Sequence, residues 1–415
     1  YVSGSMSEGD IVPGLSDIDC VITIDDLGAR EEYRLMTELE RKIRYRMPPF
    51  GKDKIGVHVV AYSSAEWSLL GDLFLGKKAG KPRPLFRKNE TAPGYRFGEK
   101  IKTLHHLYKA LWKIINLQDG ILKPSGDPLE GKLTKRIIVR TMITLDHAME
   151  EAGSDNVPRE YSVLRNRARE SWEIFNRTGD ESIHIEMLAI LLHLFDVAAG
   201  ALGESIVSGE GDSPGALEAA GQTAGMPSEI AGIVPFIKDN VNDKDGVLYK
   251  LSDKTDIFLF DQANYALSAA IIKYYKGIGE RSLRIMSIDR FQQFFLNFSE
   301  QTAVDVFSGE TYILKGTRDY EALLLDAYSI LPQLRAPGNC RSRERYEAFR
   351  GKAEGILRAL DASGRDGQAP DEGPKDRAGT VEEDEYKRFT DLKDMSRALT
   401  AGLAKFLSSR YGRGA

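Results

Sequence analysis

Cysteine is scarce in this sequence, with only two among 415 residues. Cys20 lies in an apolar run and Cys340 in a polar segment far away along the chain. Two cysteines so widely separated do not form a disulfide framework, and they lack the close spacing of a zinc-binding motif. This scarcity is typical of proteins from a reducing compartment, so we expect a cytoplasmic location.

Long hydrophobic runs are also missing. No stretch of about 18 consecutive apolar residues occurs, and the first residues do not have the pattern of a signal peptide. We therefore predict no membrane partner. Hydrophobic residues make up 42% and charged residues 29% of the chain, as in ordinary globular proteins. A chain of this length exceeds one ordinary core, so we expect two or three domains.

An excess of positive charge is absent too, because the formal net charge is -5. The whole surface therefore does not attract nucleic acid. Two segments, 77–88 and 132–140, are locally basic. The second places four cations at helical spacings, namely Lys132, Lys135, Arg136 and Arg140. Such a row usually faces solvent, but it would bind phosphates if it bordered a cleft. No P-loop, dinucleotide fingerprint or Gly-x-Ser-x-Gly motif occurs.

The N-terminal part of the chain has the pattern of a strand, a helix and a second strand. The β-branched run at 20–24 and the run at 54–62 both predict strands. Between them, residues 29–47 place apolar side chains at helical spacing. Two prolines, Pro48 and Pro49, end this helix because proline cannot donate a backbone hydrogen bond.

After residue 98 the sequence is dominated by amphipathic segments with few credible strands. The clearest predicted helices lie at 99–117, 133–151, 161–175 and 184–202. The last of these is apolar nearly all round, which predicts a central buried helix. Helical patterns resume near residue 261 and continue to the end of the chain.

The stretch GSMSEGDIVPGLSDID, near the start, places two carboxylates one residue apart. On a strand, Asp17 and Asp19 would point to the same face. Paired carboxylate oxygens suit Mg²⁺, a hard cation that is commonly held by one or two carboxylates and substrate phosphates. Upstream, Gly4 and Ser5 could let backbone amides and a hydroxyl approach a triphosphate, since glycine tolerates the backbone conformation required.

This combination resembles the DNA polymerase β-like nucleotidyltransferase superfamily. The signature of that superfamily is an apolar residue, Gly-Gly or Gly-Ser, about a dozen residues, and then acidic-apolar-acidic-apolar. Here Gly4-Ser5 is followed by eleven residues and then by Asp17-Ile18-Asp19-Cys20. The resemblance covers only about residues 1 to 65.

The resemblance implies transfer of a nucleoside monophosphate from a nucleoside triphosphate to a hydroxyl group, with release of pyrophosphate. Asp17 and Asp19 would then hold Mg²⁺ or Mn²⁺, and Gly4 and Ser5 would bind the β and γ phosphates. The acceptor stays open between a small molecule, a protein side chain and an RNA end such as that of tRNA. The preferred nucleotide and the oligomeric state are also undetermined by the sequence.

The chain departs from the superfamily at the third acidic residue, which usually lies on a neighbouring strand. The strand predicted at 54–62 contains no acid, and Gly56 or His58 takes the expected position. His58 could act as a catalytic base, since imidazole titrates near neutrality, or it could simply pack. Asp53 and Glu66 flank the strand as the nearest acids. A degenerate nucleotide sensor or scaffold is therefore the main alternative, and a purely structural interaction protein is a third.

We predict an α+β fold in which a nucleotidyltransferase domain precedes a mainly α-helical region. The predicted parts are a nucleotidyltransferase domain at 1–98, a helical domain at 99–202, a flexible joint at 203–229, a second helical region at 230–360, a flexible linker at 361–385 and a C-terminal helix at 386–415.

Overall fold

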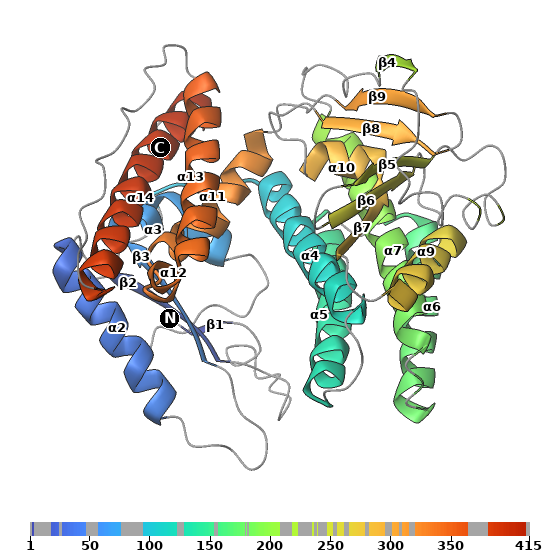
Figure 1. The fold of residues 1–415 in the computed structure, drawn as a ribbon, viewed down its shortest axis with the longest axis horizontal. Coiled ribbons are helices and arrows are strands. Elements are labelled where there is room, and N and C mark those ends of the chain that lie inside the picture. The colour runs from blue at the N-terminus through green and yellow to red at the C-terminus, as the bar shows by residue number, and fades with distance from the viewer. Residues whose placement is uncertain are drawn as a thin grey trace. The chain divides into compact units, whose positions relative to one another are not determined.

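The protein folds into two compact units, of which one interrupts the other in the sequence. Unit 1 combines residues 1–98 with residues 323–415, and unit 2 comprises residues 99–322. In Figure 1 the first segment of unit 1 is blue and its second segment runs from orange to red. The computed structural model describes residues 2–3, 18–24, 27–46, 57–75, 94–122, 128–152, 157–178, 180, 182–207, 218–222, 235, 239, 247–251, 255–260, 265–278, 282–294, 301–306, 309–314, 320–363 and 381–411.

Unit 1 contains a small sheet in the order β1-β2-β3 and helices from both ends of the chain. Strand β1 runs antiparallel to β2, and β2 runs parallel to β3. Its elements are β1 (Val2–Ser3), β2 (Ile18–Ile24), α2 (Ala29–Arg46), β3 (Val57–Ser63), α3 (Ser64–Leu75), α11 (Tyr320–Leu334, which enters the unit at Leu323), α12 (Gly338–Arg341), α13 (Arg343–Ser363) and α14 (Val381–Tyr411).

The predicted strand, helix and second strand are confirmed. The run of β-branched residues in β2 suits a pleated strand. Helix α2 has acidic Glu31 and Glu32 in its first turn, where they complement the positive end of the helix dipole. Parallel strands need a crossover connection of this length, and α2 supplies it between β2 and β3.

The C-terminal helices complete the interior of unit 1. Helix α14 packs against α2, α3 and α13. On its inner side Phe389, Leu392 and Leu399 are completely buried. The last helix therefore belongs to the core of the N-terminal part, although more than 300 residues separate the two in the sequence.

Unit 2 begins with four long helices and continues with a mixed sheet. The predicted helices at 99–117, 133–151, 161–175 and 184–202 are confirmed, each with small extensions. The elements are α4 (Glu99–Leu122), α5 (Pro128–Ala152), α6 (Arg159–Thr178), α7 (Ser182–Val207), β4 (Glu218–Gln222), β5 (Val247–Leu251), β6 (Thr255–Phe260), α9 (Tyr265–Ile278), β7 (Ser282–Ser287), α10 (Ile288–Phe294), β8 (Gln301–Asp305) and β9 (Glu310–Leu314).

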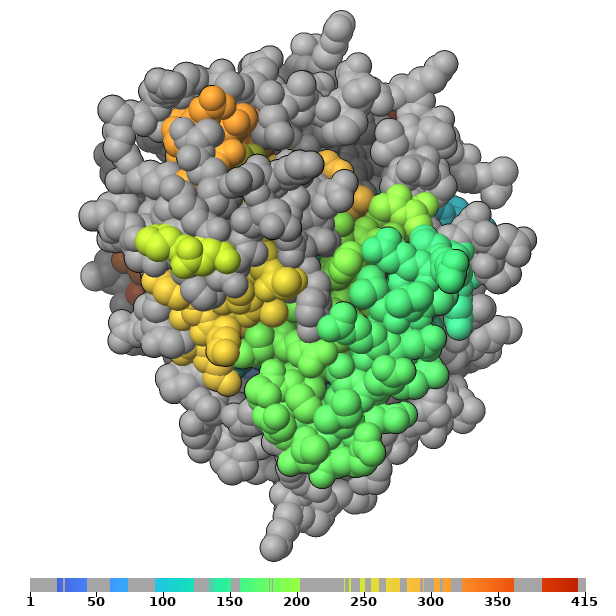
Figure 2. Space-filling model, turned by 90° about the vertical axis from the view of Figure 1, so that its right-hand side faces the viewer, coloured from blue at the N-terminus to red at the C-terminus, as the bar shows by residue number. Residues whose placement is uncertain are grey.

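Helix α7 is the central helix of unit 2, as its sequence predicts. It packs against α4, α5, α6 and α9. Figure 2 shows a face of the unit that is covered by the green surface of α6 and α7 and the yellow surface of α9. Among the described residues, Ser182–Ala201 is long and apolar enough to cross a membrane, with a mean hydropathy of 1.6. Two thirds of its most apolar window is nevertheless buried inside the protein, as in the core helix of a globular unit.

Unit 2 contains a mixed sheet in the order β4-β9-β8-β5-β6-β7, and all of its strands except β4 lie within the segment that we predicted as a second helical region, 230–360. That prediction is wrong for this part of the chain. Strands β6 and β7 are parallel, and α9 connects them. In both strands burial alternates over the first four residues and the last three are all buried, so the alternation is too short to mark a strand clearly. The general prediction of a mixed, mostly helical α and β protein is confirmed.

The β8–β9 connection explains part of the missed sheet. Gly309 has a φ of 70° and donates its amide to the carbonyl of Asp305 over 2.9 Å. Only glycine adopts this left-handed conformation without steric cost, so it permits a short turn between antiparallel strands. In the sequence this glycine is one of 39 and did not by itself indicate a hairpin.

The remaining predicted boundaries fall largely outside the described residues. Of the predicted joint at 203–229, the structure describes the last residues of α7 up to Val207 and the strand β4. Of the predicted linker at 361–385, it describes the end of α13 up to Ser363 and the start of α14 from Val381.

Candidate functional site

The strand pairing of unit 1 positions the candidate catalytic segment. In the antiparallel pair, Ser3 of β1 is the register partner of Asp19 in β2. In the parallel pair, Asp19 is in turn the register partner of His58 in β3. The backbone therefore brings three positions together that the sequence separates, and Asp19 lies between the other two.

The predicted site residues are only partly covered by the structure. Gly4, Ser5 and Asp17 lie outside the described residues. Asp19 and His58 are placed by their strands, while their side chains lie outside the described part. The structure adds one fact on the site, namely that His58 of β3 is the strand neighbour of Asp19.

Glu66, one of the two alternatives for the missing acid, has a structural role instead. Its carboxylate is completely buried in the first turn of α3. It accepts hydrogen bonds from the backbone amide of Ser63 at 2.6 Å and from the hydroxyl of Ser396 at 2.5 Å. Arg335 donates three further bonds of 2.9 to 3.1 Å from Nε and Nη2. A carboxylate has about four lone-pair positions, so Glu66 cannot also bind a metal. Asp53, the other alternative, lies outside the described residues.

Ser63 and Glu66 form a capping box at the start of α3. The backbone amide of Glu66 donates to the Ser63 hydroxyl over 3.2 Å, while the Glu66 carboxylate accepts from the Ser63 amide. This reciprocal arrangement satisfies two amides that the helix cannot bond internally. Because Ser63 is the last residue of β3, the motif fixes where the strand ends and the helix begins.

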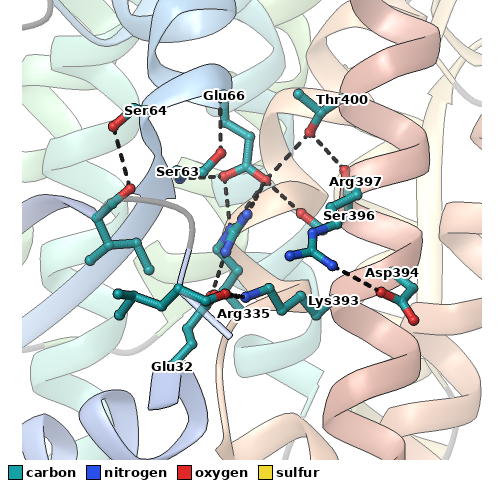
Figure 3. A network of polar contacts seen from close by, with 12 residues as sticks. Glu32, Ser63, Ser64, Glu66, Arg335, Lys393, Asp394, Ser396, Arg397 and Thr400 are labelled. Carbon is teal, nitrogen blue, oxygen red and sulfur yellow. Dashed lines mark hydrogen bonds and ion pairs between the residues drawn. The ribbon is translucent and has the colours of Figure 1, made fainter. Parts of the chain in front are cut away.

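Glu66 belongs to a buried network of four charges in unit 1 (Figure 3). Besides binding Glu66, Arg335 forms an ion pair through Nη1 with Glu32 of α2. Lys393 of α14 places its Nζ 2.5 Å from Glu32 Oε2, as an ion pair rather than a well-directed hydrogen bond, and also donates to the carbonyl of Leu27. The four charged side chains are at most 3% exposed and their formal charges cancel.

The charge balance is what makes this burial tolerable. Removing a charge from water costs several kcal/mol, and only a partner with good geometry offsets that cost. Burial alone would lower the pKa of Arg335, but Glu66 and Glu32 outweigh it and raise the pKa above the ordinary value. The guanidinium therefore stays charged, and the network ties α2 and α3 to the C-terminal helices.

Aromatic side chains pack beside the end of β3. Tyr62 stacks on Tyr328 of α11 with ring centroids 6.3 Å apart, and Trp67 of α3 lies at the same distance from Tyr62. Burial raises the pKa of Tyr62, and burial likewise raises the pKa of Tyr328 to about 12. Both tyrosines therefore remain protonated and act as neutral packing groups.

Sequence reasoning missed the network because its members are far apart along the chain. The Ser63-x-x-Glu66 spacing is a recognisable capping signal and could have assigned Glu66 a structural role. No comparable local signal marks Arg335 or Lys393. Arg335 lies in the turn directly after α11 and Lys393 in the amphipathic helix α14, and at such positions a basic residue is normally exposed.

Unit 2 offers no metal centre among the residues that the structure describes, where groups of three potential ligands are absent. A pocket beside α7 and β7 has a volume of about 10 Å³, which is roughly the space of one water molecule. Asp196 there accepts hydrogen bonds from Ser287 and Arg290. This pocket is too small for a nucleotide.

The predicted basic row on α5 is partly used for packing. Lys135 places its ammonium 4.6 Å from the ring centroid of Phe175 on α6, which is a cation–π contact. Arg140 is half-buried, and the side chains of Lys132 and Arg136 lie outside the described part of the chain. At Lys135, at least, a phosphate would have to compete with an aromatic partner.

Comparisons with known proteins do not assign a family. A scan against protein-family models, a search of curated proteins and a search of solved structures found no match. The function has to be inferred from the residues and the fold themselves.

Proposed function

We propose that the protein is a Mg²⁺-dependent nucleotidyltransferase that moves a nucleoside monophosphate from a nucleoside triphosphate to a hydroxyl acceptor and releases pyrophosphate. The observation that carries this proposal is the register of the sheet in unit 1. Ser3, which precedes the Gly4-Ser5 pair in the chain, is the partner of Asp19, which closes the Asp-x-Asp motif. The residue before the Gly-Ser pair and the last residue of the Asp-x-Asp motif are thus neighbours on adjacent strands.

The residue types fit the proposed cofactor. Asp17 and Asp19 offer hard carboxylate oxygens, which are the ligands that Mg²⁺ takes in phosphoryl-transfer sites. Bound there, the metal would neutralise charge on the phosphates. Gly4 and Ser5 would bind the β and γ phosphates through amides and a hydroxyl. His58 would accept the proton of the attacking hydroxyl, since its strand position neighbours Asp19.

The second candidate is a sensor or scaffold that binds the nucleotide without transferring it. It is favoured by the residue opposite Asp19, because a histidine stands where a third carboxylate is expected. Glu66 cannot replace that carboxylate, since the buried network already uses both of its oxygens. Both candidates need the same nucleotide site, so binding and turnover have to be measured separately.

Nucleotide binding tests the site itself. We expect one of ATP, GTP, CTP and UTP to raise the melting temperature in the presence of Mg²⁺, because a ligand that binds only the folded state stabilises it. Asp19→Asn should lose this shift, because the substitution removes a ligand charge without changing the side-chain volume. Asp361→Asn, an exposed position of α13, is the matched control and should keep it. No shift with any triphosphate would contradict both candidates.

Turnover at His58 separates the two candidates. Pyrophosphate release is measured for the wild type and for His58→Ala with the nucleotide identified by the melting experiment. For an enzyme with a histidine base, we expect a loss of about 10²-fold or more in rate while the Mg²⁺-dependent shift is kept. A wild-type protein that shifts but releases no pyrophosphate with a broad acceptor panel would favour the sensor.

A further inference from the structure

Helix α6 of unit 2 has a buried side and an exposed side. Its buried residues, which attach the helix to the rest of the unit, are Tyr161, Leu164, Ala168, Ser171 and Phe175. On the exposed side, six residues follow one another at alternating spacings of three and four: Glu160, Val163, Arg167, Glu170, Ile174 and Arg177. We name these six residues the α6 seam, and all of them are exposed. Figure 2 shows α6, in green, at the surface of unit 2.

The spacing of the seam is that of the contact positions in a pair of packed helices. Residues that alternate by three and four stay on one side of a helix, where a second helix can contact all of them. Val163 and Ile174 are 59% and 44% exposed, so two branched apolar side chains of the seam face solvent. A single exposed apolar residue needs no explanation, but one partner helix would cover both of these and remove their apolar surface from water.

The charges of the seam match a second copy of the same helix. Two copies of α6 can lie antiparallel about a two-fold axis that passes midway between Arg167 and Glu170. Each residue before the axis then lies opposite the residue equally far behind it, and the axis repeats every contact. Three pairs come together in this way, namely Val163 with Ile174, Arg167 with Glu170, and Glu160 with Arg177. The two copies thus join apolar residues to apolar residues and each acid to a cation.

Other arrangements of the two helices bring like charges together. In a parallel pair each residue faces its own copy, so Arg167 meets Arg167 and Glu170 meets Glu170. In an antiparallel pair that is displaced by one heptad, Glu170 meets Glu160 in one direction, and Arg167 meets Arg177 in the other. Like charges that face each other are unfavourable. The seam therefore favours one orientation and one register.

Two charges of the seam also have contacts within their own chain. Glu160 lies 3.2 Å from Nε2 of His193, and Arg167 lies 3.6 Å from a carboxylate oxygen of Glu186. The Glu160 side chain nevertheless stays 61% exposed, and that of Arg167 stays 48% exposed. A carboxylate has about four lone-pair positions and a guanidinium has several N–H donors, so both groups can bind a further partner.

We propose that α6 is a self-association surface, through which two copies of the protein form an antiparallel dimer with two-fold symmetry. Helix α6 is about 30 Å long at 1.5 Å per residue. One such helix pair buries less than the roughly 1,200 Å² of a standard interface, so the dimer should be weak, with a Kd of about 1–100 µM. The seam belongs to the exposed surface of the single chain, so neither the fold of unit 2 nor the proposed nucleotide site depends on the dimer.

Sedimentation velocity of the full chain at about 1 to 200 µM measures the self-association. The average mass of the wild type should rise from one chain toward two. Arg167→Glu and Glu170→Arg each turn two attractive contacts into repulsive ones, and each should weaken the dimer at least about tenfold. Ile174→Lys should weaken it by a similar factor, because it removes both apolar pairs. Circular dichroism checks that each variant is folded.

Mixing the two charge variants is the sharpest test. In a dimer of one Arg167→Glu chain and one Glu170→Arg chain, each central pair again joins an acid to a cation. We therefore expect the equimolar mixture to dimerise like the wild type, although neither variant does so alone. The matched control is Arg169→Glu, at an exposed position of α6 outside the seam, which should also dimerise like the wild type.

Cysteine variants test the orientation of the pair. Val163→Cys mixed with Ile174→Cys should form a disulfide-linked dimer under mild oxidation. Either variant alone should not, because two copies of one position lie about 16 Å apart along the helices. A wild type that stays monomeric, charge variants that dimerise like the wild type, or a linked dimer of Val163→Cys alone would overturn the proposal. Asp19→Asn should dimerise normally, so the nucleotide site and the α6 seam succeed or fail independently.

Discussion

The two units are stabilised by different kinds of interior. Unit 1 buries two carboxylates and two cations among helices from opposite ends of the chain. Unit 2 is built from one continuous segment around α7, where Leu188, Leu191 and Leu194 are fully buried among apolar neighbours. Apolar packing is non-directional, whereas a charge network is stable only when every partner is in place.

This difference between the two interiors suggests a reason for the buried charges of unit 1. Helix α14 has to pack on α2 and α3 in one register, although nothing local in the sequence links them. An apolar contact would tolerate a shift of the helix along its axis, but a shifted α14 would leave Glu32 without Lys393. We infer that the network specifies this packing at some cost in stability, a role that buried polar groups have in other folds.

Breaking the buried charge network of unit 1 should cause the largest loss of stability. Arg335→Met keeps most of the side-chain volume but leaves Glu66 and Glu32 short of a buried cation, and we expect a loss of about 3–5 kcal/mol in the stability of unit 1. Hydrogen exchange resolved by peptide measures this, because α14 reports on unit 1 and α7 on unit 2. The protection of α14 should fall and that of α7 should persist.

The control for this change is Arg343→Met. The Arg343 side chain is 79% exposed and pairs weakly with Glu347 at 4.0 Å, so its loss should change stability by less than about 1 kcal/mol. Equal effects of the two substitutions would mean that the buried network contributes no more than a surface pair.

A cavity in unit 2 should lower the stability somewhat less, and the loss of exchange protection should appear in unit 2 instead of unit 1. Leu191→Ala removes buried methyl groups from α7 and should cost about 2–5 kcal/mol. Loss of exchange protection should then appear in α7 and spare α14. Val163→Ala, at a position that is 59% exposed, is the matched control. If Leu191→Ala destabilises α14 as much as α7, the units unfold together and the contrast between them does not hold.

The smallest expected loss of stability is that of unit 2 when the pH is lowered. In folded unit 2 the pKa of His106 is about 3 because of burial and of the cations Lys109 and Lys113 together with His147, whereas an unfolded histidine titrates near 6.5. Between these values only the unfolded chain binds the proton, so stability present above pH 6.5 is lost as the pH falls. The loss is at most about 1.4 kcal/mol per pH unit.

The exchange protection of α4, followed from pH 7.5 down to about pH 5, tests this dependence. His106→Gln removes the group and should reduce the pH dependence while leaving the difference between pH 7 and pH 7.5 unchanged. An identical pH profile in the variant and the wild type would show that His106 is not responsible.

Local patterns predicted local structure well. The β-branched run at 20–24, the helical spacing at 29–47 and the apolar character of α7 each depend on neighbours within one element, and each prediction agrees with the elements that the structure describes. The sheet of unit 2 was missed because the parallel strands β6 and β7 are short and alternate over only their first four residues before a fully buried end. The partners Glu66 and Arg335 are 269 residues apart, and the periodicity of a single sequence contains no information on such pairs.

In the candidate site, too, the local features could be predicted from the sequence and the contacts between distant residues could not. The spacing of Gly4-Ser5 and Asp17-x-Asp19 is a local pattern and could be read directly. That Asp19 has His58 as its strand partner follows from the pairing of β2 with β3, and the sequence alone left the choice between Gly56 and His58 open. The role of Glu66 depends on Arg335, which follows α11, and on Ser396 of α14, and was therefore not predictable from its neighbourhood.

The order of the chain has a consequence for biosynthesis. Glu66 leaves the ribosome well before its partner Ser396, which is 330 residues later in the sequence. At roughly 5–20 residues per second, the N-terminal strands and helices wait about 15 to 65 s for the C-terminal helices that neutralise their carboxylates. Unit 2 is complete before unit 1 can close. The N-terminal part of unit 1 is thus translated before unit 2 but reaches its native state after it, and during that interval it depends on whatever shields a nascent chain from aggregation.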